Sequence, residues 1–161
     1  MKSVVIPEGI EKIENHWFCC SKVEQIEIPA SVREIGADVF YGCKSLKNVT
    51  FAEDSKLEKI GSGCFCKSGI ERITIPKGFE EIQNDAFRDC ENLKEVVFEA
   101  GSALRKIGDR AFCNCKSLKN IQFPGDLETI GMGWFARSGL EEVVLPESVK
   151  SIESYTFSLC N

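Results

Sequence analysis

The chain has 161 residues and is 43% hydrophobic, which is enough apolar material for a sizeable core. Its 25 acidic and 20 basic residues give a formal net charge of −5, and the two signs are interspersed without a basic stripe, which argues against nucleic acid as a partner. No apolar run approaches the roughly 20 residues of a membrane span, and the run within residues 1–7 is too short for a signal peptide.

In chain order, the first predicted elements are short strands in which apolar and polar residues alternate. The alternation and the β-branched content are typical of half-buried strands. Proline ends most of them, as at Pro29 and Pro76, where its missing N–H is tolerated. The predicted strands are 23–28, 46–51, 70–75, 93–98, 118–123 and 140–145.

Each strand is followed by a second apolar pair, such as Val32 and Ile35, which predicts a shorter extended segment on an opposite wall. A segment of the form Gly-x-x-Ala-Phe-x-x-Cys comes next. We expect its Ala-Phe part to form a single helical turn that directs the Phe into the core. We expect its glycines to permit a turn with positive φ. These glycines are Gly36, Gly61, Gly108 and Gly131.

The whole pattern repeats with a period of 22–25 residues. Phenylalanine recurs in the same setting at Phe18, Phe40, Phe65, Phe87, Phe112, Phe135 and Phe157. Isoleucine stands five residues before each, at Ile13, Ile35, Ile60, Ile82, Ile107, Ile130 and Ile152. Such a period predicts a solenoid in which stacked strands form one parallel sheet, with neighbours about 4.8 Å apart.

We therefore expect residues 1–161 to form a single solenoid of about seven repeats. Neither end resembles a polar cap, so we expect a segment of a longer array, in which uncapped coils could pair end to end as a homodimer.

The motif Leu-x-x-Ile-x-Ile-Pro-x-x-Val-x-x-Ile-Gly-x-x-Ala-Phe-x-x-Cys, clearest in residues 29–43 and 93–115, resembles the BspA-like class of leucine-rich repeats. The resemblance covers essentially the whole chain. It implies a curved parallel β-sheet with a free concave face, and short strands and helical turns on the convex side. It also implies a cell-surface or secreted location, adhesion to a host, matrix or other cell-surface protein, and no catalytic role for any repeat position.

The candidate binding surface is the concave face, where alternation directs two residues of each strand outward. The first column is Gln25, Asn48, Arg72, Glu95, Asn120 and Glu142, and the second is Glu27, Thr50, Thr74, Val97, Gln122 and Val144. Polar groups on a rigid sheet need little ordering on binding, which favours recognition of a protein. The opposing interpretation is a solvated face, because no aromatic anchor is present.

The nine cysteines are interpreted first as small apolar filler, because serine takes the position three after Phe in three copies. Cys90 and Cys115 lie in adjacent coils, but side chains in a parallel stack point the same way, which disfavours a disulfide. Cys64-x-Cys66 and Cys113-x-Cys115 lack the spacing of zinc motifs, so no metal site is predicted. Unpaired thiols indicate a reducing compartment or deep burial, which conflicts with a surface location.

No catalytic residue or cofactor is predicted. A Ser-His-Asp or Cys-His site would need His16, the one histidine, which we expect to be exposed. The segment 61–63 has glycines but no strand–GxxxxGK–helix context. Three hypotheses remain: a non-enzymatic adhesion module, a structural spacer without a ligand of its own, and a thiol-based redox or metal-binding protein.

Overall fold

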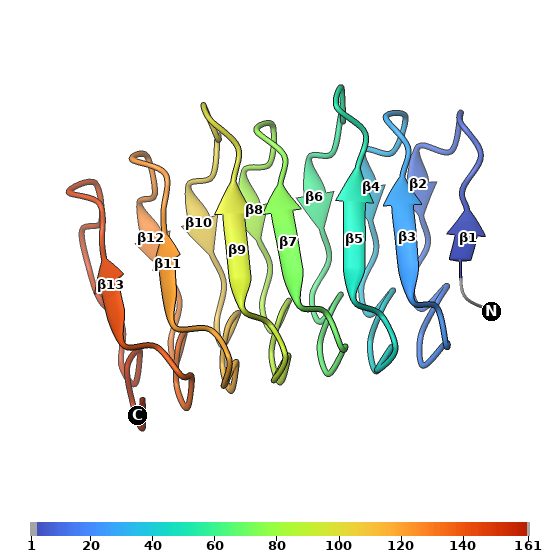
Figure 1. Cartoon of the computed structure of the whole chain (residues 1–161). Helices are drawn as coiled ribbons and strands as arrows, with labels where there is room; N and C mark the ends of the chain where they lie inside the picture. Colours follow the sequence, from blue (N-terminus) through green and yellow to red (C-terminus); the bar gives the residue numbers. More distant parts are fainter. Residues whose placement is uncertain (1–2, 161) are drawn as a thin grey trace.

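The computed structural model describes residues 3–160, and this part of the chain winds into a solenoid with two walls of parallel strands (Figure 1). Met1, Lys2 and Asn161 lie outside the described residues. The longer strands form one wall: β1 (Ser3–Val5), β3 (Gln25–Ile28), β5 (Asn48–Phe51), β7 (Arg72–Ile75), β9 (Glu95–Phe98), β11 (Asn120–Gln122) and β13 (Glu142–Val144). The opposite wall has two-residue strands: β2 (Lys12–Ile13), β4 (Glu34–Ile35), β6 (Lys59–Ile60), β8 (Glu81–Ile82), β10 (Lys106–Ile107) and β12 (Thr129–Ile130).

The strands pair in parallel with the equivalent strands of neighbouring coils, as the repeat predicts, except that β9 and β11 are not paired. On the longer wall β1-β3-β5-β7-β9 form one sheet and β11-β13 form a second one beside β9. The longer strands begin two residues later than predicted. Their first apolar residues are buried in a turn instead, since the N–H groups of Leu46 and Leu93 donate to the carbonyls of Cys43 and Cys90.

The sheet divides between β9 and β11 where the core holds its largest side chain. Trp134 is fully buried in a position that is Ala86 or Ala111 in the two preceding coils. Its ring centroid lies 4.7 Å from that of Phe123 and 4.5 Å from that of Phe135. The extra volume of the indole is accommodated at the same place where the strand pairing is interrupted.

The predicted column of phenylalanines is confirmed. Neighbouring rings from Phe18 to Phe135 stack with centroids 5.2–5.6 Å apart, and the step from Phe135 to Phe157 is 6.3 Å. The five members from Phe40 to Phe135 are fully buried. Burying one such ring contributes about 1.5–3 kcal/mol, so this column is a principal source of stability.

The expected helical turn around each Phe is wrong; the residues form consecutive β-turns. Around Phe65, the N–H of Cys66 donates to Gly63 O and that of Ser68 to Phe65 O, while Phe65 N–H itself donates to Ala86 O of the next coil. Alternate N–H groups thus bond within the coil and between coils. A helix with its side chains is about 10–12 Å across, which cannot fit in a stack whose rings repeat every 5.2 Å.

The role predicted for the four glycines is also wrong, because none of them has positive φ. Residues with positive φ lie instead two before and two after each Phe, for example Asp85 (φ 57°) and Asp89 (φ 58°) around Phe87. Glycine is needed at Gly61 for another reason: a Cβ there would lie 2.5 Å from the Ala37 nitrogen of the preceding coil. The motif glycine therefore allows two backbones to approach closely.

Candidate functional site

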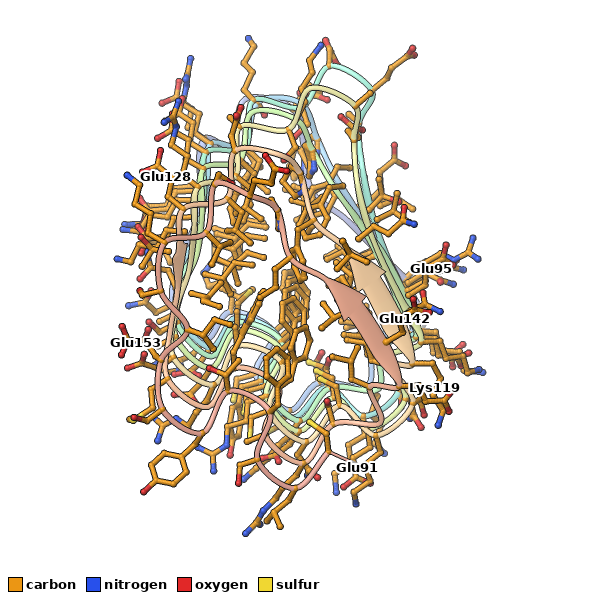
Figure 2. All side chains as sticks on the ribbon, turned by 90° about the vertical axis from the view of Figure 1, so that its left-hand side faces the viewer. Glu91, Glu95, Lys119, Glu128, Glu142 and Glu153 are labelled. Carbon is orange, nitrogen blue, oxygen red and sulfur yellow. The ribbon has the colours of Figure 1, made fainter. Side chains whose placement is uncertain are left out.

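The twelve residues of the two predicted columns lie together on the outer side of the longer wall. Eleven are exposed and Glu95 is half-buried, while residues that alternate with them, such as Ile26 and Ile73, are buried. The strand register aligns the columns, since Gln25 pairs with Asn48, and Arg72 with Glu95. Figure 2 shows Glu95 and Glu142 directed away from the core on this side, with Glu128 on the opposite side.

The two columns also include Ser3 and Val5 of β1, which are not among the residues predicted from the sequence. Ser3 pairs with Gln25 and Val5 with Glu27, and both are exposed. The repeat could have identified both residues, because each lies one repeat of 22 residues before its partner in the column. We call the surface formed by these fourteen residues the sheet face.

Three shallow hollows lie along the sheet face. The first, of 520 Å³, is lined over β1, β3 and β5 by residues that include Val5, Gln25 and Glu27. The second, of 680 Å³, lies over β11 and β13 and includes Gln122, Glu142 and Val144. The third, of 270 Å³, lies between β5 and β7. The first two each combine carboxylate and amide side chains with an exposed valine.

Charge is neutralised in the middle of the sheet face. Arg72 Nη2 lies 2.5 Å from Glu95 Oε2 of the next coil. Beside the face, Lys94 Nζ lies 3.0 Å from Glu71 Oε2, and this ammonium group lowers the pKa of the Glu71 carboxyl. The carboxylates of Glu27 and Glu142 form no ion pair within residues 3–160, so the negative charge is concentrated towards the two larger hollows.

The cysteines of the Phe-x-x-Cys position are part of the core. The thiol of Cys90 donates to Phe65 O at 2.9 Å and that of Cys115 to Phe87 O at 3.1 Å, each to the preceding coil. Burial raises the pKa of Cys90 to about 12 and that of Cys115 well above its ordinary value. All nine cysteines are unpaired, and Cys90 and Cys115 form no disulfide. Serine fits the same position because its hydroxyl is also small. Ser68 occupies it in its own coil, and its Oγ lies 3.5 Å from Cys90 Sγ.

The other residues that were considered as catalytic, phosphate-binding or metal-binding candidates do not lie together in one site. His16 is exposed as expected, with 63% of its side chain accessible and Nδ1 4.0 Å from Asp38 Oδ2. Residues 61–63 lie in the turn that precedes Phe65. In the part of the chain that the structure describes, no cluster of three or more His, Cys, Asp or Glu side chains could hold a metal ion. Over the same residues, no helix has the length and apolar character that crossing a bilayer demands.

Coils of 22–25 residues, each with a Phe in the central column and with parallel strands stacked from coil to coil, define a leucine-rich-repeat solenoid. The chain belongs to the BspA type leucine-rich repeat region family, whose model matches in six copies over residues 1–94 and 92–161.

Solved structures of bacterial leucine-rich repeat proteins are similar to it. The pneumococcal vaccine antigen PcpA is 28% identical with a TM-score of 0.85, over 95% of this chain and 42% of that one. A leucine-rich repeat protein of T. pallidum is 28% identical with a TM-score of 0.64, over 98% and 65% of the two chains. A leucine rich cell surface protein of Faecalibacterium prausnitzii A2-165 is 25% identical with a TM-score of 0.58, over 96% and 48%.

This chain thus spans from less than half to about two thirds of the length of these structures. A comparison with functionally curated proteins finds no significant match.

Proposed function

We propose that this chain is a non-enzymatic protein-binding module of an adhesion-type leucine-rich repeat protein, and that the sheet face is its binding surface. The observation that carries the proposal is the fixed display of fourteen outward residues in two columns on a parallel sheet. Their strands pair with one or both neighbouring coils, so binding would order few groups and would lose little conformational entropy.

The chemistry of the hollows indicates the kind of protein surface that would fit. Glu27 and Glu142 present carboxylates without ion-pair partners in the described residues, and side-chain amides lie beside them. Val5 and Val144 are 89% and 72% exposed and supply apolar contact. The complementary partner is a protein segment that carries basic and amide groups together with small apolar side chains.

The test exchanges the charges of one ion pair without removing it. In the double variant Arg72→Glu/Glu95→Arg the pair is retained with reversed polarity on the sheet face. The matched control is Arg105→Glu/Glu128→Arg, a pair at 3.0 Å between adjacent coils on the opposite wall. Purified protein is screened against host, matrix and cell-surface proteins, and each partner found is measured by surface plasmon resonance.

We expect Arg72→Glu/Glu95→Arg on the sheet face to weaken binding at least tenfold. We expect Arg105→Glu/Glu128→Arg on the opposite wall to leave binding unchanged. Equal loss in both variants, or no loss in either, would assign binding to another surface. A chain that binds no protein in such a screen would support the spacer hypothesis instead.

The cell-surface location is part of the same proposal. It is supported by the family and by the similar Faecalibacterium prausnitzii protein, which is a cell surface protein. Immunofluorescence on intact cells of the source organism, with and without protease treatment, tests this location. Labelling only after permeabilisation would contradict it.

We further propose that the isolated chain associates end to end as a homodimer. The coil of residues 152–159 exposes Ile152, Tyr155 and Leu159 by 58–71% and the ring of Phe157 by 39%. Stacking a second copy on this surface would remove these groups from water. Sedimentation velocity across a range of concentrations should show a dimer, and Leu159→Lys should weaken it. A monomer at every concentration would refute the proposal.

A further inference from the structure

Two of the nine cysteines differ from the others because they stand next to each other at the surface. Cys19 and Cys20 follow Phe18 in the turn of the first coil, and their Sγ atoms lie 3.6 Å apart. Cys20 is exposed and Cys19 is half-buried. In the equivalent pair of positions the later coils have at most one cysteine, as in Cys66-Lys67 and Cys113-Asn114. A pair of adjacent thiols therefore occurs in one coil of the repeat.

The backbone holds the two thiols in place. The N–H of Cys19 donates to His16 O at 3.0 Å, and that of Cys20 donates to Tyr41 O of the next coil at 2.8 Å. The space beside the Cys20 thiol is left open by Gly42, where a Cβ would lie 3.0 Å from the Sγ atom. The main chain of both residues is thus held by hydrogen bonds, and the Cys19 thiol donates to Cys20 Sγ. Both thiols remain accessible from solvent.

The separation of the sulfurs suits one bridging atom better than a direct bond. Two thiolates bound at about 2.3 Å to a tetrahedral centre are about 3.8 Å apart, whereas a linear two-coordinate centre would need about 4.6 Å. A disulfide usually joins residues whose Cα atoms are about 4.4–6.8 Å apart, and adjacent residues are only about 3.8 Å apart. The observed 3.6 Å matches the bent arrangement.

We propose that Cys19 and Cys20 form a vicinal-dithiol site that chelates a soft, thiophilic centre with a bent S–X–S geometry. Because the structure brings no third His, Cys, Asp or Glu ligand to this place within residues 3–160, the site fits a centre that needs two thiols from the protein. A monosubstituted arsenic(III) compound meets this requirement. The site is independent of the sheet face and of the protein-binding function proposed above.

Phenylarsine oxide is the probe. Two S–As bonds form, the arsenic–oxygen bond breaks, and the oxygen leaves as water with the two thiol protons, so no oxidant or reductant is consumed. The reaction is followed by mass spectrometry of the intact folded chain. We expect one arsenical per chain, and we expect the adduct to survive excess monothiol and to be removed by excess dithiol.

Three variants test the assignment. Cys19→Ser and Cys20→Ser each leave one thiol and should abolish the adduct that survives monothiol. The control Cys113→Ser removes a half-buried thiol from the equivalent turn position of another coil and should leave the adduct unchanged. Thermal unfolding establishes that all three variants are folded.

Persistence of the adduct in Cys19→Ser or Cys20→Ser would overturn the proposal, as would the absence of any adduct on the folded wild-type chain. Adduct formation only under denaturing conditions would show that the thiols are not accessible in the native state and would refute it equally. None of these results depends on whether a protein partner of the sheet face has been found.

Discussion

Truncation of Phe87 is the most direct test of the stacked core. The ring is fully buried, and its centroid lies 5.2 Å from that of Phe65 and 5.3 Å from that of Phe112. Replacing a buried Phe by Ala costs about 3–5 kcal/mol from lost transfer free energy and the cavity that remains. Loss of two stacked contacts places Phe87→Ala in the upper part of this range, at about 4–5 kcal/mol.

The matched comparison is Phe157→Ala, which removes the same atoms from the last ring of the column. This ring is 39% exposed, and the one ring that stacks on it is 6.3 Å away, so we expect a cost of about 1–2 kcal/mol. Phe87→Leu keeps most of the volume but loses the stacking and should lie between the two alanine variants.

Urea unfolding followed by circular dichroism and by tryptophan fluorescence measures the free energy of unfolding. The two signals also reveal whether the solenoid unfolds in parts. A cost for Phe87→Ala that is no larger than that for Phe157→Ala would refute the reasoning, because it would mean that the central rings do not stabilise their neighbours. A changed urea slope in one variant would require the comparison to be repeated with local probes.

Two further expectations concern close packing and buried thiols. A Cβ on Gly69 would lie 2.1 Å from Lys44 O, so Gly69→Ala should lower the melting temperature strongly, whereas Gly125→Ala, with open space around it, should not. The pKa of Cys90 is raised to about 12 from 9.0, so the unfolded chain loses this proton first as pH rises. The associated stability is therefore complete below about pH 9 and falls by about 1.4 kcal/mol per pH unit up to about pH 12. Comparing the unfolding free energies of wild type and Cys90→Ala at pH 8 and pH 11 isolates this effect; a difference that stays constant would contradict it.

The sequence predicted the fold because the repeat determines which residues become neighbours. Once Phe and Ile recur every 22–25 residues, equivalent residues must stack, and the parallel walls follow from that. The positions of Phe87 and Ile82 in the core, and of Arg72 and Glu95 on the sheet face, were therefore correctly assigned.

Local conformation was harder to predict because it depends on the spacing between coils. The Ala-Phe segment has helix-forming residues, but its N–H groups are shared with the next coil at a spacing that excludes a helix. The sequence pattern correctly indicated that glycine is needed at Gly61, but the predicted reason was wrong. Glycine is needed there because the backbone of the preceding coil lies close, and not because of a positive φ. The division of the sheet near Trp134 could not be foreseen, because one residue in one coil carries no periodic signal.

The same stacking supports the proposal that the sheet face is the binding surface. In the core, each residue contacts its own equivalent one coil away, so substitution of one member leaves a mismatch on both sides. On the sheet face, the equivalents in the first column are Ser, Gln, Asn, Arg, Glu, Asn and Glu, and most of them are exposed. Stability places little constraint on exposed positions. Variation between coils is therefore tolerated there, and the sheet face shows such variation in charge over strands that remain in register.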